Sequence, residues 1–103
     1  MILLFSYGTL TDKKIQIDEF NITFLVEDEL EEISGFDMSQ IEIDGIYYNI
    51  LLTSNNQKTI SGKIVHIPEE VINQVDNYEG ESYKRITTKT KSGRNCQVYV
   101  KQN

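Results

Sequence analysis

Two short segments of the chain combine side chains and a glycine that suit catalysis. Tyr7-Gly8-Thr9-Leu10 follows an apolar run, and Asp76-Asn77-Tyr78-Glu79-Gly80 is followed closely by Tyr83. A glycine just past a strand lets the chain turn so that successive N–H groups converge on an oxyanion or a carboxylate. A glutamate among aromatic rings in a partly dry setting has a raised pKa, which suits a general base. The two segments therefore indicate an anion-binding loop and a tuned carboxylate, Glu79.

Each of these residues also has an ordinary structural interpretation. The first segment is then a strand-to-turn exit in which Thr9 caps a helix, and Glu79 is a helix-end side chain in water. Tyr83 and Tyr99 either pack against a ligand or fill the core, and for Tyr99 we favour the core. Arg85 either contacts a substrate carboxylate or is a surface strand residue.

The composition narrows the remaining chemistry. With one histidine and one cysteine in 103 residues, the chain cannot form an intramolecular disulfide or a Cys/His zinc quartet. Any Ser–His or Cys–His nucleophile pair would have to use His66, but we interpret His66 as a packed or surface residue. Cys96 lies on an alternating strand and is interpreted as buried and inert. We expect no cofactor and no metal, and interpret the acidic run 27–32 as an exposed edge or turn.

The charge distribution bears on partners and location. A net charge of −6 argues against nucleic-acid binding, which needs basic side chains. No apolar run is long enough to span a membrane, and the apolar N-terminus lacks the basic flank of a signal peptide, so we expect a cytoplasmic protein. Residues 1–51 hold 11 acids and 2 bases, and residues 52–103 hold 5 acids and 8 bases. The basic excess either faces an anionic ligand or, as we favour, forms a solvated strand face.

The elements that must position these residues form one domain, residues 1–103. We expect a central strand at 2–5, a short helical turn near 13–15, alternating strands at 20–26, 41–52 and 60–67, a helix from Pro68 to about 77, and a hairpin over 83–100. Gly62 marks a bend or a close backbone approach. The pattern predicts an α+β fold: a small mixed β-barrel or strongly curled sheet of about six strands with one main helix.

The two segments, in this order and with Gly62-Lys63-Ile64 between them, resemble the γ-glutamylcyclotransferase-like family, which includes the γ-glutamylamine cyclotransferases and the AIG2-like proteins. The family pattern is Tyr-Gly-(Ser/Thr)-(Leu/Asn), then Gly-x-(Val/Ile), then Leu-Asp-x-Tyr-Glu-Gly with Tyr-x-Arg, then a closing strand. Here Tyr83-Lys84-Arg85 and Val98-Tyr99-Val100 supply the last two elements. The chain departs from the pattern in its middle third, where Gly45-Ile46-Tyr47-Tyr48-Asn49 lacks the usual proline.

The resemblance implies an enzyme that acts on a small-molecule γ-glutamyl substrate. The free α-amine of the γ-glutamyl group attacks its own γ-carbonyl, closing 5-oxoproline and releasing an amine or amino acid. Glu79 is then the general acid/base, the backbone amides of Gly8, Thr9 and Leu10 grip the glutamyl group, and Tyr7 lines its pocket.

We also place Tyr83 among the substrate-binding residues, and we expect neither a nucleic acid nor a membrane as partner. One alternative is a non-catalytic module that binds a γ-glutamyl or anionic ligand on the same fold. A weaker alternative is an interaction protein whose acidic first half docks a basic partner. The identity of the amine and the oligomeric state stay open.

Overall fold

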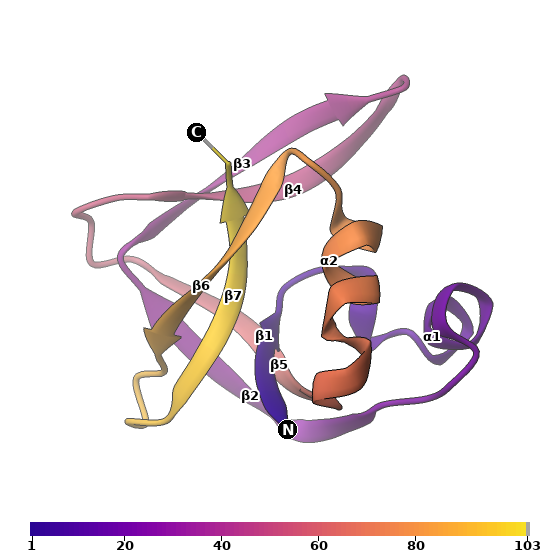
Figure 1. The fold of residues 1–103 in the computed structure, drawn as a ribbon. Helices are drawn as coiled ribbons and strands as arrows, with labels where there is room; N and C mark the ends of the chain where they lie inside the picture. Colours follow the sequence, from indigo (N-terminus) through magenta and orange to yellow (C-terminus); the bar gives the residue numbers. More distant parts are fainter. Residues whose placement is uncertain (103) are drawn as a thin grey trace.

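Strand β1 (Ile2–Ser6) lies at the centre of a five-stranded mixed sheet in the computed structural model, which describes residues 1–102 (Figure 1). The sheet order is β2-β5-β1-β7-β6, and β1 runs antiparallel to β5 and parallel to β7. Strands β3 and β4 form a separate hairpin. The other elements, in chain order, are η1 (Thr9–Thr11), α1 (Lys13–Phe20), β2 (Leu25–Ser34), β3 (Phe36–Ile43), β4 (Ile46–Thr53), β5 (Thr59–Ile67), η2 (Glu69–Val71), α2 (Ile72–Glu79), β6 (Tyr83–Lys89) and β7 (Asn95–Lys101).

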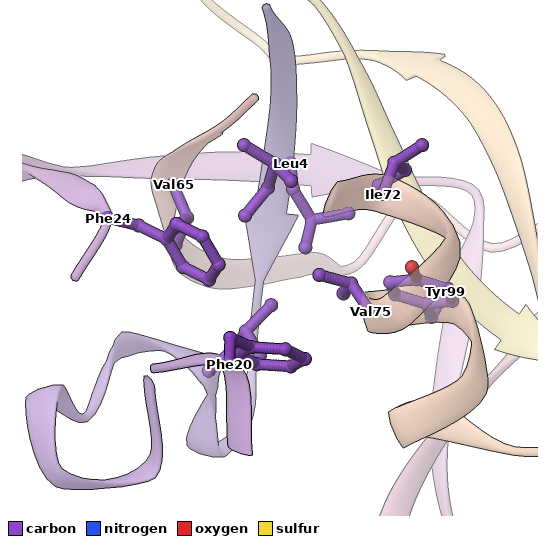
Figure 2. Packing of buried hydrophobic residues seen from close by; sticks show 9 residues of the cluster. Leu4, Phe20, Phe24, Val65, Ile72, Val75 and Tyr99 are labelled. Carbon is purple, nitrogen blue, oxygen red and sulfur yellow. The ribbon is translucent and has the colours of Figure 1, made fainter. Parts of the chain in front are cut away.

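The two faces of the sheet bury two separate hydrophobic cores. Side chains alternate between the faces of a strand, so Leu4 packs under the helices while Phe5 packs on the opposite face. On the helix side, α1 and α2 contribute Phe20, Ile72 and Val75 (Figure 2). The base of the β3–β4 hairpin covers the other face, where Phe36 and Leu51 are buried. The expected α+β class is therefore confirmed, with the central strand buried on both faces.

The sheet curls until its two ends meet, but it does not close. The N–H of Lys91, in the turn after β6, donates to the carbonyl of Glu32 on β2 at 2.8 Å. Arg94 also donates to Glu27 at 2.6 and 2.8 Å and to Glu31 at 3.2 Å. Within residues 1–102, β6 and β2 form no strand ladder. Of the two predicted alternatives, the β-barrel is therefore wrong, and the structure is a curled open sheet.

The segment after β1 forms a full second helix, so the prediction of one main helix and a strand from residue 20 is wrong. Asp12 caps α1 by accepting from the N–H of Lys14 at 2.9 Å, and Asn21 ends it in a left-handed conformation with φ of 59°. Phe20 and Phe24 looked like alternating strand residues. They lie instead on the helix and the following loop, where their rings pack 5.5 Å apart.

Several local predictions match the structure. Asp44 and Gly45 form the β3–β4 turn with positive φ values of 51° and 80°. Gly62 sits against β1 so closely that a Cβ there would lie 2.5 Å from the Ser6 carbonyl oxygen.

The start of the second helix differs from the prediction. Pro68 precedes the 3₁₀ turn η2, so α2 begins four residues later than the proline position suggested. No helix within residues 1–102 has the length and apolar character needed to cross a membrane.

Candidate active site

A cavity of about 250 Å³ opens where β1 ends, between the β3–β4 hairpin and the end of α2. This volume lies just below the roughly 300–1,000 Å³ of most small-molecule sites, which suits a ligand the size of an amino acid. Its lining comes from five parts of the chain: Leu4, Phe5, Ser6, Tyr7, Gly8, Thr9, Tyr47, Tyr48, Asn49, Glu79, Tyr83 and Tyr99. Glu79 thus faces the same cavity as the loop after β1, although the two segments are about seventy residues apart in sequence.

Glu79 is the last residue of α2 and carries a perturbed carboxyl group. Burial and, to a smaller extent, the negative charge of Asp76 one turn earlier together raise its pKa from 4.5 to about 7. The C-terminal end of a helix also disfavours negative charge. Gly80 ends the helix with φ of 90°, a conformation that favours glycine. Within residues 1–102 no group donates a hydrogen bond to the Glu79 carboxylate, which is therefore available to a ligand.

The loop after β1 presents backbone donors to the cavity. In the described part of the chain, the N–H groups of Gly8, Thr9 and Leu10 make no hydrogen bond to the protein backbone. Gly8 has φ of −131°, which any residue adopts, and a Cβ there would meet no protein atom within 4 Å. Since Gly8 lines the cavity, the space that a side chain would occupy there is part of the cavity.

Leu10 differs from the other loop residues that the sequence singled out, because its side chain is not part of the cavity lining. It is 2% exposed and packs in the core under the helices. The buried amide of Gln16 donates to the Leu10 carbonyl at 2.8 Å and accepts from the N–H of Phe24 at 2.8 Å. Gln16 of α1 therefore fixes the loop after β1 in place. Of the groups of Leu10, the backbone N–H is the one that can bind a ligand.

Hydroxyl groups tie the loop to its surroundings. Thr9 Oγ1 hydrogen-bonds to the Tyr78 hydroxyl at 2.9 Å, which links the loop to α2. This contact and the capping of α1 by Asp12 exclude the interpretation of Thr9 as the cap of that helix. The Tyr7 hydroxyl donates to the Tyr99 carbonyl at 2.8 Å. Tyr7 is therefore part of a fixed wall.

The hairpin supplies a wall that the sequence did not predict. Tyr48 and Asn49 line the cavity, and the Tyr83 hydroxyl donates to the Asn49 carbonyl at 2.9 Å. Tyr83 thus lines the cavity together with the hairpin. The alternating pattern of β4 predicted a strand but contained no sign of which residues overhang the loop after β1, since the curl of the sheet decides that.

Arg85 lies on strand β6, is partly exposed, and is not part of the cavity lining. Its Nε and Nη2 donate to the two carboxylate oxygens of Asp76 at 2.9 and 3.1 Å, and Nη1 donates to Gln97. Tyr99 is 5% exposed in the core, as favoured, yet it also lines the cavity and donates its hydroxyl to Asp76 at 2.6 Å. Asp76 was missed as a functional candidate because its partners come from two strands that follow it.

The remaining candidates lie away from the cavity. His66 Nε2 pairs with Glu27 at 2.7 Å on the sheet, and Cys96 is a buried free thiol in the core under the hairpin. In the described chain no cluster of three or more His, Cys, Asp or Glu side chains is placed to hold a metal ion. The cavity lining contains no lysine or arginine, so an anionic ligand would depend on the backbone N–H groups.

A second cavity of about 380 Å³ adjoins the first one. The two share four lining residues: Thr9, Tyr48, Glu79 and Tyr83. Beyond these, the second cavity is lined by Ile43, Tyr78 and the turn after α2, which runs over residues 80–82. Glu79 therefore stands at the junction of two spaces, one beside the loop amides and one under the hairpin tip.

Comparisons with known proteins agree with this geometry. The family model for "Gamma-glutamyl cyclotransferase, AIG2-like" matches residues 4–103. No curated protein sequence matches the chain. Among solved structures, At3g28950.1 from Arabidopsis thaliana is 18% identical with a TM-score of 0.77, covering 97% of this chain and 61% of that one.

Two further structures give the same result. A structure described as a gamma-glutamyl cyclotransferase is 17% identical with a TM-score of 0.75, covering 99% of this chain and 67% of that one. An uncharacterized protein, loc79017 from Homo sapiens, is 19% identical with a TM-score of 0.74, covering 99% and 67%. At these identities the likeness establishes the fold, and the chain spans about three fifths to two thirds of the length of these proteins.

Proposed function

Because the chain belongs to the γ-glutamyl cyclotransferase, AIG2-like family, we propose that it converts a γ-glutamyl amide into 5-oxoproline and a free amine or amino acid, with Glu79 as general acid/base. The observation that carries the proposal is the placement of a carboxyl group with a pKa of about 7 in one small cavity with the loop after β1.

The substrate supplies the nucleophile, so the protein's task is to position the substrate and to move protons. Folding the glutamyl chain inside a cavity of about 250 Å³ brings its α-amine to the γ-carbonyl, and such intramolecular arrangements reach effective molarities of ~10⁵ M or more. The N–H groups of Gly8, Thr9 and Leu10 are the donors for the α-carboxylate or for the oxyanion that forms at the γ-carbonyl. Tyr7 and Tyr83 are the walls that hold the glutamyl chain.

Glu79 has a proton affinity matched to this task. An α-ammonium group with a reference pKa of about 8 gives up a proton to an ordinary carboxylate near 4.3 at a cost of about 5 kcal/mol. With the pKa of Glu79 at about 7, the difference falls to about one unit, or about 1.4 kcal/mol. Glu79 takes a proton from the α-ammonium group, and the amine nitrogen bonds to the γ-carbon to give a tetrahedral intermediate. Glu79 gives that proton to the leaving nitrogen, whose C–N bond breaks as the γ-carbonyl re-forms. The ring nitrogen then loses its second proton to Glu79, which passes it to the released amine to give an ammonium ion.

The amine side of the substrate extends into the second cavity in this arrangement. Glu79 lines both cavities, so a proton taken up on the glutamyl side is returned to a leaving nitrogen at the junction. The wall on the amine side consists of Ile43, Tyr48 and Tyr78. Ile43 and Tyr48 belong to the middle third, where the sequence departs from the family pattern, so the preference for the amine is set there.

The test is release of 5-oxoproline from a panel of γ-glutamyl amines and γ-glutamyl amino acids by purified protein. We expect product from at least one member and a loss of at least about 10²-fold in kcat for Glu79→Gln. Exposed Glu42→Gln, on the outer part of the hairpin, is the charge-matched control and keeps wild-type activity. Product formed equally well by Glu79→Gln would refute the role of Glu79. Ligand binding by calorimetry without any product would favour the binding module.

A further inference from the structure

Asp76 is held by two partners and touches neither cavity. It lies on α2, three residues before Glu79. Its carboxylate accepts two hydrogen bonds from Arg85 and one from the Tyr99 hydroxyl. Asp76 and Arg85 are absent from the lining of both cavities. Any influence of Asp76 on the reaction therefore passes through other residues.

The spacing on α2 gives Asp76 a route to Glu79. Residues three apart on a helix share one face, with Cβ atoms about 5–6 Å apart, so the two carboxyl groups are close neighbours. A negative charge at this range raises the proton affinity of Glu79, and a positive charge lowers it. Arg85 pairs with Asp76 at 2.9 Å, so the field at Glu79 is the difference between an acid and the base that partly neutralises it.

We propose that Asp76 is a positioning residue that, together with Arg85, sets the pH range in which Glu79 exchanges its proton, and that holds the Tyr99 ring against the cavity. The catalytic consequence of this inference rests on the proposed function, while the electrostatic coupling does not. Asp76 raises the proton affinity of Glu79 through space, and Arg85 limits that effect to a range useful near neutral pH.

Besides Asp76 and Arg85, the titratable groups around Glu79 are phenols and one further acid, Glu81. Four phenols surround the carboxyl group: Tyr7, Tyr78, Tyr83 and Tyr99. Burial raises the pKa of each of them above its ordinary value, so all four are neutral near pH 7. Tyr48 on the hairpin is a further phenol, and Glu81 in the turn after α2 is the other acid beside the second cavity.

The test compares two substitutions whose effects have opposite signs. Asp76→Asn removes the negative charge and leaves Arg85 unpaired, so we expect the pKa of Glu79 to fall by about one unit. Arg85→Gln leaves the Asp76 charge unpaired, so we expect the pKa to rise by about one unit. Tyr99→Phe, which removes a hydrogen bond without a change in charge, shifts the pKa by less than either.

The pKa is read by ¹³C NMR titration of the Glu79 side-chain carboxyl in the free protein, and the acid limb of kcat/KM is measured in parallel. Opposite shifts support the inference, and shifts of the same sign, or none, overturn it. The double variant Asp76→Asn/Arg85→Gln leaves neither charge unpaired, so we expect its Glu79 pKa within about half a unit of the wild-type value. If Asp76→Asn does not fold, the double variant and Arg85→Gln provide the test. Opposite NMR shifts in a protein that releases no 5-oxoproline would support the coupling and refute the proposed function.

Discussion

Replacing Glu79 with glutamine should make the protein more stable at neutral and alkaline pH. Burial at the end of α2 holds the pKa of Glu79 at about 7 instead of 4.5, so the folded state binds a proton more tightly than the unfolded chain does. The ionised carboxylate of Glu79 is therefore less stable in the folded protein than in the unfolded chain. Glutamine has nearly the same shape and stays neutral at every pH.

The magnitude follows from the displacement of the pKa. Each pH unit corresponds to about 1.4 kcal/mol, so raising the pKa from 4.5 to about 7 makes the Glu79 carboxylate cost about 3 kcal/mol in the folded state. Because the folded-state pKa is raised, this cost is absent below about pH 4.5, grows between pH 4.5 and 7, and is constant above. Relative to wild type, Glu79→Gln should gain about 3 kcal/mol of unfolding free energy at pH 8.5 and almost nothing at pH 4.5.

The assay is urea unfolding of both proteins at pH 4.5, 6, 7 and 8.5. Glu81→Gln is the matched control, since it removes the same charge from an exposed position two residues further along the chain. We expect the control to change stability by less than about 0.5 kcal/mol at every pH. A stability difference for Glu79→Gln that does not vary with pH, or a loss of stability at pH 8.5, would refute the claim that burial raises the proton affinity of Glu79.

Three further substitutions test how the scaffold holds the site. Gly62→Ala places a Cβ 2.5 Å from a carbonyl oxygen of β1 and should lower the urea-unfolding free energy by about 3 kcal/mol; an unchanged midpoint would contradict this close approach. Gln16→Met leaves the buried carbonyl of Leu10 and N–H of Phe24 without their partner and should cost about 3 kcal/mol, measured in the same way. Mainly through its hydrogen bonds, Arg94 lowers the pKa of Glu27 to about 2. The ion pair between them therefore stabilises the fold above about pH 4.5, and this stabilisation fades as the pH falls toward 2. Thermal unfolding of Glu27→Gln should therefore show a deficit at pH 6 that disappears near pH 2, and an equal deficit at both pH values would rule out the ion pair as its cause.

The local parts of the fold could be predicted from the sequence. The central strand, the Asp44-Gly45 turn, the close approach at Gly62 and the C-terminal hairpin each follow from short-range patterns. Helix α1 was underestimated because its buried positions include the polar Gln16, so apolar spacing alone contains little sign of it. Its role depends on two backbone partners outside the helix, which no periodicity reveals.

The candidate site could be predicted only where its residues lie in the two motifs. Glu79 and the residues from Tyr7 to Thr9 line one cavity, as the motifs suggested. The contact of Tyr83 with Asn49 spans 34 residues and depends on how the hairpin folds over the sheet. Asp76 meets its partners only because β6 and β7 return beside α2. These contacts follow from the curl of the sheet, which local sequence does not specify.

The pH dependence of 5-oxoproline release decides whether Glu79 is the general acid/base. With one γ-glutamyl amide as substrate, kcat/KM should fall tenfold per pH unit below a limb at about pH 7, where the pKa of Glu79 lies. Glu79→Gln should lose both the activity and the limb. Release of 5-oxoproline with a limb near pH 4.5, or no release from any γ-glutamyl amide at any pH, would contradict the assignment of Glu79 as the general acid/base of a γ-glutamyl cyclotransferase.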